Sequence, residues 1–164
     1  MIGILPEHFM KMFEDPIKSI RTNRRINKVE LLATEELDNG TRCTVIASHM
    51  LPPSAFISGR IFIGANYLYP EQSIVISSSR GNDRYQNDYL AAGRNEGKTP
   101  ANNRFSGHWY QPLTDPLDPT KVLGTKIIFV NESDFGGSFP KWIVQKLAPP
   151  GLNDFYEDLI SDVR

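Results

Sequence analysis

The sequence predicts an α+β fold, in which a curved antiparallel sheet of about six strands lies between a short N-terminal helix and a long C-terminal helix. Short apolar and β-branched segments are separated by Gly, Asn and Pro turns. Asp38-Asn39-Gly40 joins two such segments, and Asn-Gly supplies the positive φ angles that a tight hairpin needs. Gly136-Gly137 ends the last strand abruptly, and an amphipathic helix follows it.

The N-terminal helix is predicted over Leu5 to Phe13. Pro6 suits its first turn, Glu7 suits its positive end, and Phe9 and Phe13 share one apolar face. Asp15-Pro16 is expected to end it. Between positions 18 and 28 there are only basic charges, which indicates either a solvated face or a surface that attracts anionic lipid. These basic residues are Lys18, Arg21, Arg24, Arg25 and Lys28.

The strands that follow are short, and most are separated by turn residues. Their predicted ranges are 28–34, 41–48, 55–64, 73–79, 104–113 and 122–132. The longest loop runs from Arg80 to Asn103, is rich in Gly and Asn, and can hold a helical turn between Tyr85 and Ala92. The last two strands are joined by a Pro-rich turn over Thr114 to Thr120.

The closing helix is predicted from about Phe139 to Ala148, with a continuation through Phe155 and Val163. Ser138 can cap it, and Pro140 sits in the first turn, where a missing N–H costs nothing. Its apolar face consists of Phe139, Trp142, Ile143 and Leu147. Antiparallel strands need a cover on one face, so this helix and the sheet would enclose a space that is either core or cavity.

Length and composition indicate a single domain over residues 1–164. The net charge of −1 gives no global attraction for nucleic acid. The one cysteine, Cys43, excludes an internal disulfide framework and fits a reducing compartment. No signal peptide or membrane span is recognisable, which together predict a cytoplasmic protein.

Patterns typical of catalysis are absent from the sequence. His8, His49 and His108 are far apart and have no metal-ligand spacing. There is no phosphate-binding loop and no nucleophile elbow. The sequence therefore predicts no metal, no cofactor and no enzymatic activity.

Several motifs, in this order and spacing, resemble START (StAR-related lipid transfer) domains from Leu5 to Ala148. They are Phe13-Glu14-Asp15-Pro16, Leu37-Asp38-Asn39-Gly40-Thr41, Leu51-Pro52-Pro53, Ser106-Gly107-His108-Trp109-Tyr110-Gln111-Pro112-Leu113, Gly136-Gly137 and Pro140-Lys141-Trp142. The resemblance implies a helix-grip fold with a hydrophobic cavity, and a protein that binds a phospholipid, sterol or ceramide and transfers it at a transient membrane contact.

The resemblance also implies site residues. The expected lipid-binding residues are Arg60, Phe62, Ser77, Trp109, Phe129, Phe139, Trp142, Ile143 and Leu147, and the expected membrane-contact loop is Met50, Leu51 and Pro52. Arg60 shares one strand face with Phe62, where a buried guanidinium would need a partner such as a lipid phosphate. Ile57, Ile61 and Ile63 favour the opposite orientation, with Arg60 in solvent.

The sequence also departs from the START pattern. Trp109 is one place away from the usual Trp, where His108 stands, and the loop from Arg80 to Asn103 is longer than usual. START domains carry a helix and about three strands ahead of the matched part, so the chain is N-terminally short and an exposed sheet edge would allow a dimer. Two other functions stay open: an interaction module without a ligand, and a helix-grip cyclase or thioesterase-associated domain.

Overall fold

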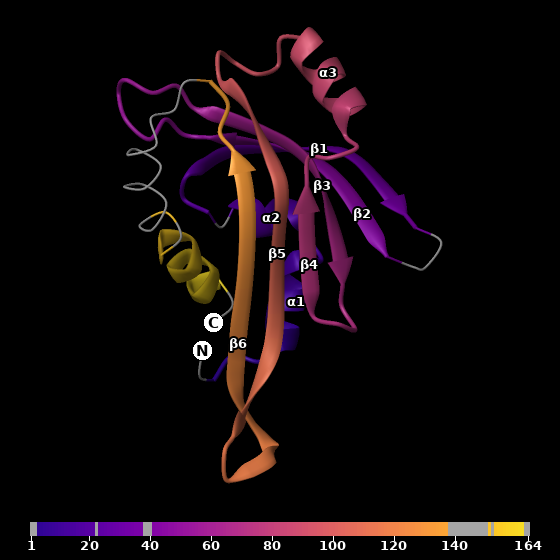
Figure 1. The fold of residues 1–164 in the computed structure, drawn as a ribbon, viewed down its shortest axis with the longest axis vertical. Coiled ribbons are helices and arrows are strands. Elements are labelled where there is room, and N and C mark those ends of the chain that lie inside the picture. Colours follow the sequence, from indigo (N-terminus) through magenta and orange to yellow (C-terminus); the bar gives the residue numbers. More distant parts are fainter. Residues whose placement is uncertain (1–2, 22, 38–40, 138–150, 152, 163–164) are drawn as a thin grey trace.

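The structure is a computed structural model, and it describes residues 3–21, 23–37, 41–137, 151 and 153–162. Six strands form one curved sheet in chain order, from β1 to β6 (Figure 1). Their bounds are β1 Ile26–Glu36, β2 Arg42–Met50, β3 Arg60–Tyr69, β4 Ile74–Ser78, β5 Thr99–Asp115 and β6 Asp118–Asp134. The predicted α+β class is confirmed.

Strands that follow one another along the chain pair in antiparallel orientation throughout. β4 is short, so it covers only the second half of β3. The first residues of β3 pair instead with the start of β5 in parallel, with Arg60 opposite Thr99 and Phe62 opposite Ala101. This contact closes the gap that β4 leaves.

Helix α1 (Pro6–Phe13) forms as predicted and buries Phe9, Met10 and Met12. A second helix, α2 (Pro16–Arg21), follows it at once and was not predicted. The Asp15 side chain accepts hydrogen bonds from the backbone N–H groups of Ile17 and Lys18, both at 3.0 Å. Asp15-Pro16 therefore starts a new helix as well as ending the first one.

One hydrophobic core lies between the sheet and the terminal helices. It joins α1, the helix over residues 153–162, and the middle of the sheet. Phe9 stacks on Tyr110 with ring centroids 4.7 Å apart, and both are fully buried, as is Leu159. In Figure 1, α1 and α2 lie behind the part of the sheet formed by β4 to β6, and the C-terminal helix lies to the left of β6. These helices cover the concave face.

A second core lies on the other face, under α3 (Asp83–Ala91). Alternate residues of β2 and β3 supply it, and Tyr89 of α3 packs on them with 2% of its surface exposed. The buried members are Cys43, Val45, Ala47, Ile61, Ile63, Ala65 and Tyr89. The sheet is thus covered on both faces where β2 and β3 pair.

The bounds of β3, β5 and β6 differ most from the prediction. Residues 55–59 form a loop, and β3 begins only at Arg60. Gly59 lies so close to β2 that an added Cβ would be 2.5 Å from the Met50 carbonyl oxygen. β5 and β6 are longer than predicted and form a hairpin arm that extends beyond the rest of the sheet (Figure 1).

The predicted Gly-Gly turn is present, since Gly136 and Gly137 both have φ of 64°. A Cβ on Gly136 would lie 2.1 Å from the Pro100 carbonyl oxygen, so the close approach requires glycine. The Asn39-Gly40 turn and the helix predicted from Phe139 to Ala148 lie outside the described residues.

Candidate functional site: a cavity under the concave sheet

A cavity of about 480 Å³ lies between the concave face of the sheet and the helices. Strands β2 to β6 form its floor, and Phe13, Ile20 and Phe155 from the helices face it. Side chains alternate along each strand, so every second residue points into it. On β2 these are Thr44, Ile46, Ser48 and Met50, and on β3 Arg60, Phe62, Gly64 and Asn66.

Aromatic and aliphatic groups form the end of the cavity near α1. The rings of His108 and Phe129 lie 4.5 Å apart, and the ring of Phe155 lies 5.7 Å from His108. Leu68 and Val75 complete this end. Burial lowers the pKa of His108 to about 4, so its imidazole is neutral near pH 7. The ring cluster at this end is therefore apolar and uncharged, and Arg42 lies beside it, opposite Leu68.

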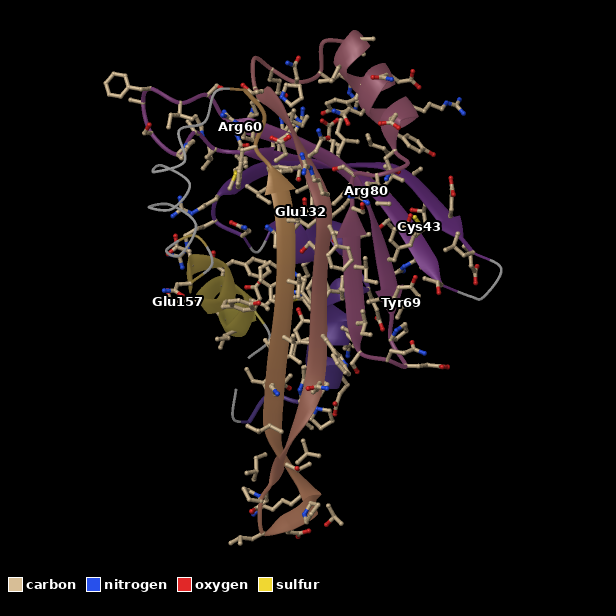
Figure 2. All side chains as sticks on the ribbon, viewed as in Figure 1. Cys43, Arg60, Tyr69, Arg80, Glu132 and Glu157 are labelled. Carbon is tan, nitrogen blue, oxygen red and sulfur yellow. The ribbon has the colours of Figure 1, made fainter. Side chains whose placement is uncertain are left out.

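The opposite end of the cavity is formed by the start of β3 and the end of β6. Phe62 and Phe135 meet edge to face with centroids 6.0 Å apart. Met50 at the end of β2 and Pro53 in the loop after it line the same region. This end also carries Arg60 (Figure 2).

Arg60 is only 5% exposed and faces the cavity. Its Nε donates to the Phe135 carbonyl oxygen at 2.6 Å, and its Nη1 donates to the Ser58 carbonyl oxygen at 2.5 Å. Burial lowers the pKa of Arg60, but a guanidinium stays charged. The alternative that placed the isoleucines inward and Arg60 in solvent is wrong. Both faces of β3 are covered, and Ile61 and Ile63 pack under α3.

Two further arginines lie at the cavity wall. Arg25 makes an ion pair of 2.6 Å with Asp154 of the C-terminal helix. Arg42 donates to the backbone carbonyl oxygen of Glu14 at the end of α1. Arg25 and Arg42 thus tie the helices to the sheet, while Arg60 ties β3 to the end of β6.

Only some of the predicted lipid-binding residues line the cavity. Arg60, Phe62, Ser77 and Phe129 line the cavity together. Trp109 does not: it is 44% exposed on the outer face, because its neighbours His108 and Tyr110 point inward. Phe139, Trp142, Ile143 and Leu147 lie outside the described residues.

The predicted membrane-contact loop lies at the cavity wall. Met50 lines the cavity, whereas Leu51 is 42% exposed and Pro52 is also exposed. Sequence reasoning missed Phe56 of the same loop, which it placed in a strand; Phe56 is 98% exposed. The turn signal of Pro52-Pro53-Ser54 could have extended the predicted loop to include it.

A compact group of charges lies on the other face, around His49, which is fully buried. Its Nε2 lies 2.8 Å from the Tyr89 hydroxyl, and Tyr89 donates to Glu30. Glu30 also pairs with Lys28 at 3.0 Å and with Arg94. Burial alone would raise the pKa of Glu30, but the hydrogen bonds from these three groups lower it to about 2.

Neither face offers a metal site: within the described residues, no three His, Cys, Asp or Glu side chains gather in a way that would hold a metal ion. Among the same residues, none belongs to a helix with the length and apolar character needed to span a membrane.

Comparison with solved structures finds human STARD10, with a TM-score of 0.65 and 16% identity over 96% of this chain and 59% of that one. The chain has a START-like fold. Human StAR-related lipid transfer protein 5 superposes with a TM-score of 0.67 and 16% identity, over 99% of this chain and 71% of that one. The chain thus spans less than two thirds of the STARD10 chain.

The same fold occurs in TTHA0849 from Thermus thermophilus, with a TM-score of 0.59 and 11% identity over 99% of this chain and 88% of that one. No protein-family model matches the sequence. No curated protein sequence matches it either. The likeness is therefore one of fold.

Proposed function

We propose that this protein binds a lipid in the cavity under the concave sheet and carries it between membranes. The observation that carries the proposal is the cavity itself, whose volume of about 480 Å³ lies in the range of ligand pockets. Most of its lining is apolar, and each CH₂ group removed from water there contributes about 0.8 kcal/mol. An acyl chain or sterol skeleton would gain most from such a site.

The fold supports the same proposal. One structural neighbour is named as a lipid transfer protein, and this chain matches 71% of its length. The proposal is one of binding without a chemical step. His108, the one histidine of the described cavity lining, has its Nδ1 buried without a hydrogen-bond partner, so that nitrogen is not oriented as in a catalytic dyad.

The loop at positions 51–58 is the part that would meet a membrane. It follows Met50 and contains Pro53, both of which line the cavity, and it presents Leu51 and Phe56 to solvent. Exposed apolar side chains next to a cavity can enter a bilayer while the lipid passes.

Native mass spectrometry of the purified protein, followed by organic extraction, tests the binding proposal. A stoichiometric lipid is expected, either co-purified or acquired from mixed vesicles. A protein that stays free of lipid after incubation with these vesicles would contradict the proposal. The same spectrum reports the oligomeric state, which tests the predicted pairing through an exposed sheet edge.

A matched pair of variants ties the result to the cavity. Ile46→Trp places a large side chain into the cavity, because Ile46 lines it. Val130→Trp adds the same bulk on the outer face, where Val130 is 57% exposed. We expect the first variant to lose lipid and the second to keep it, and equal lipid content in both would place the ligand elsewhere.

A further inference from the structure

Strand β6 is an edge of the sheet, and in the described part of the chain it pairs with β5 alone (Figure 1). The register of this pair is regular from Gly124 to Glu132. On the other side of β6, the Gly3 N–H donates to the Leu123 carbonyl oxygen at 2.8 Å, and within the described residues no such backbone bond reaches residues 126–132. We call residues 126–132 the β6 edge segment, and its outer backbone groups are open to a further strand.

The two edges of the sheet differ in how they are protected against such pairing. At the opposite edge, β1 has two register irregularities and carries several charged side chains. Bulges and charges of this kind keep edge strands from pairing with other chains. The β6 edge segment has neither a proline nor a register irregularity, and it contains the apolar run from Ile127 to Val130. A regular apolar edge strand favours pairing with another strand.

The β6 edge segment is also the last wall of the cavity. Phe129 and Asn131 line the cavity, yet Asn131 is exposed and Phe129 is only half-buried. The C-terminal helix meets β6 through the concave face, where the rings of Tyr156 and Phe129 lie edge to face with centroids 6.2 Å apart. On the convex face, Val130 is 57% exposed. The cavity wall therefore ends at a strand that is itself exposed.

A second copy of the chain fits this edge in one register. Alternate residues point to opposite faces, so two antiparallel β6 strands keep their faces matched only when the two-fold axis passes through a residue. With the axis at Phe129, Lys126 lies opposite Glu132 of the second copy, and Ile128 lies opposite Val130. With the axis at Ile128, Lys126 would face Val130. With the axis at Val130, Glu132 would face Ile128.

Both charged residues are placed for this pairing. Lys126 is exposed, and within the described residues it takes part in no ion pair. The carboxylate of Glu132 lies 3.1 Å from Arg104 of β5, but 60% of the Glu132 side chain is exposed, so a second cation can approach it from the edge. Opposite charges directly across two strands stabilise their pairing, and like charges destabilise it. By symmetry, the Lys126–Glu132 pair would form twice.

We propose that this protein forms a two-fold symmetric dimer through the β6 edge segment, with Lys126 of each copy opposite Glu132 of the other. The two sheets join into one, and Phe129 of each copy lies beside the cavity wall of the other. This inference concerns assembly and does not depend on the proposed lipid binding. One pair of strands buries a small area, so we expect a dissociation constant in the micromolar range.

Sedimentation velocity of the purified chain from about 1 to 100 μM tests the association. We expect the sedimentation coefficient to rise with concentration and to level off at the value of a dimer. A protein that stays monomeric throughout would overturn the inference and leave the lipid-binding function untouched. Growth beyond the dimer would also overturn it, because head-to-tail pairing of β6 with β1 gives open chains.

Two charge reversals test the register. Lys126→Glu and Glu132→Lys each place like charges opposite one another at both symmetric pairs, so each variant alone should dimerise roughly tenfold more weakly than the wild type. An equimolar mixture of the two variants should recover the wild-type association, because both pairs of the mixed dimer again join opposite charges. Recovery in the mixture would also show that both variants are folded.

The matched controls reverse the same charges away from the edge. Lys11 on α1 and Glu71 in the turn between β3 and β4 are both exposed. Lys11→Glu and Glu71→Lys should dimerise like the wild type, alone and when mixed. Edge variants that dimerise as well as these controls, or that do not recover in the mixture, would contradict the proposed register.

Discussion

The two faces of the sheet are built from alternate residues of the same strands, yet they differ in what they leave unsatisfied. On the convex face, β2 and β3 pack tightly under α3, and Glu30 bonds to Lys28, Tyr89 and Arg94. On the concave face, the same strands line a cavity with unpaired polar groups. On β2 and β3 the convex side therefore packs as core, whereas the concave side lines the cavity.

Each face also buries one histidine, in a different environment. His108 on the concave face lies among aromatic rings, and burial lowers its pKa to about 4. His49 on the convex face lies among Lys28, Glu30, Glu96 and Lys98, and its pKa is lowered mainly by burial. The difference gives the faces distinct responses to mutation and to pH.

The largest expected effect comes from neighbouring residues on opposite faces of β3. Ile61→Ala should lower the free energy of unfolding by about 3 kcal/mol, because Ile61 is 1% exposed in the convex core. Phe62→Ala removes more atoms but borders the cavity, so its stability loss should be less than half of that. Urea unfolding followed by circular dichroism measures both, and equal losses would show that the faces do not differ.

The second effect is a pH dependence that belongs to the concave face. The unfolded chain protonates His108 near pH 6.5, whereas the folded chain resists protonation until about pH 4. The contribution of His108 to the free energy of unfolding should therefore fall by about 3 kcal/mol as the pH drops from 6.5 to 4, and stay constant above that window. In His108→Phe, the change of the free energy of unfolding with pH should shrink to the part due to His49. An unchanged pH dependence would refute its assignment to His108.

The third effect belongs to the convex face and a lower pH window. The folded-state pKa of Glu30 is about 2, below the unfolded value of about 4.5, so its contribution is present above pH 4.5 and is lost as the pH falls toward 2. Glu30→Gln should lower the free energy of unfolding by about 1–2 kcal/mol at pH 7. Its curve of stability against pH should be flatter than that of the wild type below pH 4.5. Thermal unfolding across this range measures it, and a curve parallel to that of the wild type would argue against the ion cluster.

The smallest expected effects on stability come from substitutions of two exposed residues. Phe56 at the cavity loop is 98% exposed and Leu117 at the tip of the hairpin arm is 96% exposed, so Phe56→Ser and Leu117→Ser should each change stability by less than about 0.5 kcal/mol. Only Phe56→Ser should weaken vesicle association, measured by flotation. Equal weakening by both would indicate non-specific adsorption rather than contact through the loop.

The order of the strands could be predicted from the sequence, because alternation and turn residues act locally. The face of a strand could not be predicted where both faces are covered: on β3, Ile61 and Phe62 are equally plausible as core residues. Trp109 was expected in the cavity because of the START resemblance, although alternation with His108 and Tyr110 puts it outside. The Pro16 to Arg21 helix was missed because its amphipathic signal is short and interrupted by charges.

The polar side chains on the cavity floor show a different limit of sequence analysis. Thr44, Asn66 and Ser106 are ordinary polar residues in their own strands, and only the pairing register of five strands brings them into line. Register depends on bulges and turns as well as on the residues that pair, such as the irregularity between Asn103 and Phe105 just before Ser106. Residue patterns within one strand carry no such information.

The parallel contact between β3 and β5 has a consequence for the order of folding. Every other strand pair in the sheet joins chain neighbours, but this one brings together Arg60–Phe62 and Thr99–Ala101, with β4 and α3 in the intervening chain. Closing that loop costs conformational entropy before any contact repays it, so we expect this corner to assemble after the hairpins. The amide of Thr99, which donates to the Gly59 carbonyl at 3.0 Å, should accordingly exchange with solvent earlier than those of the central strands. The Arg60 end of the cavity would then be the last part to form and the first to open.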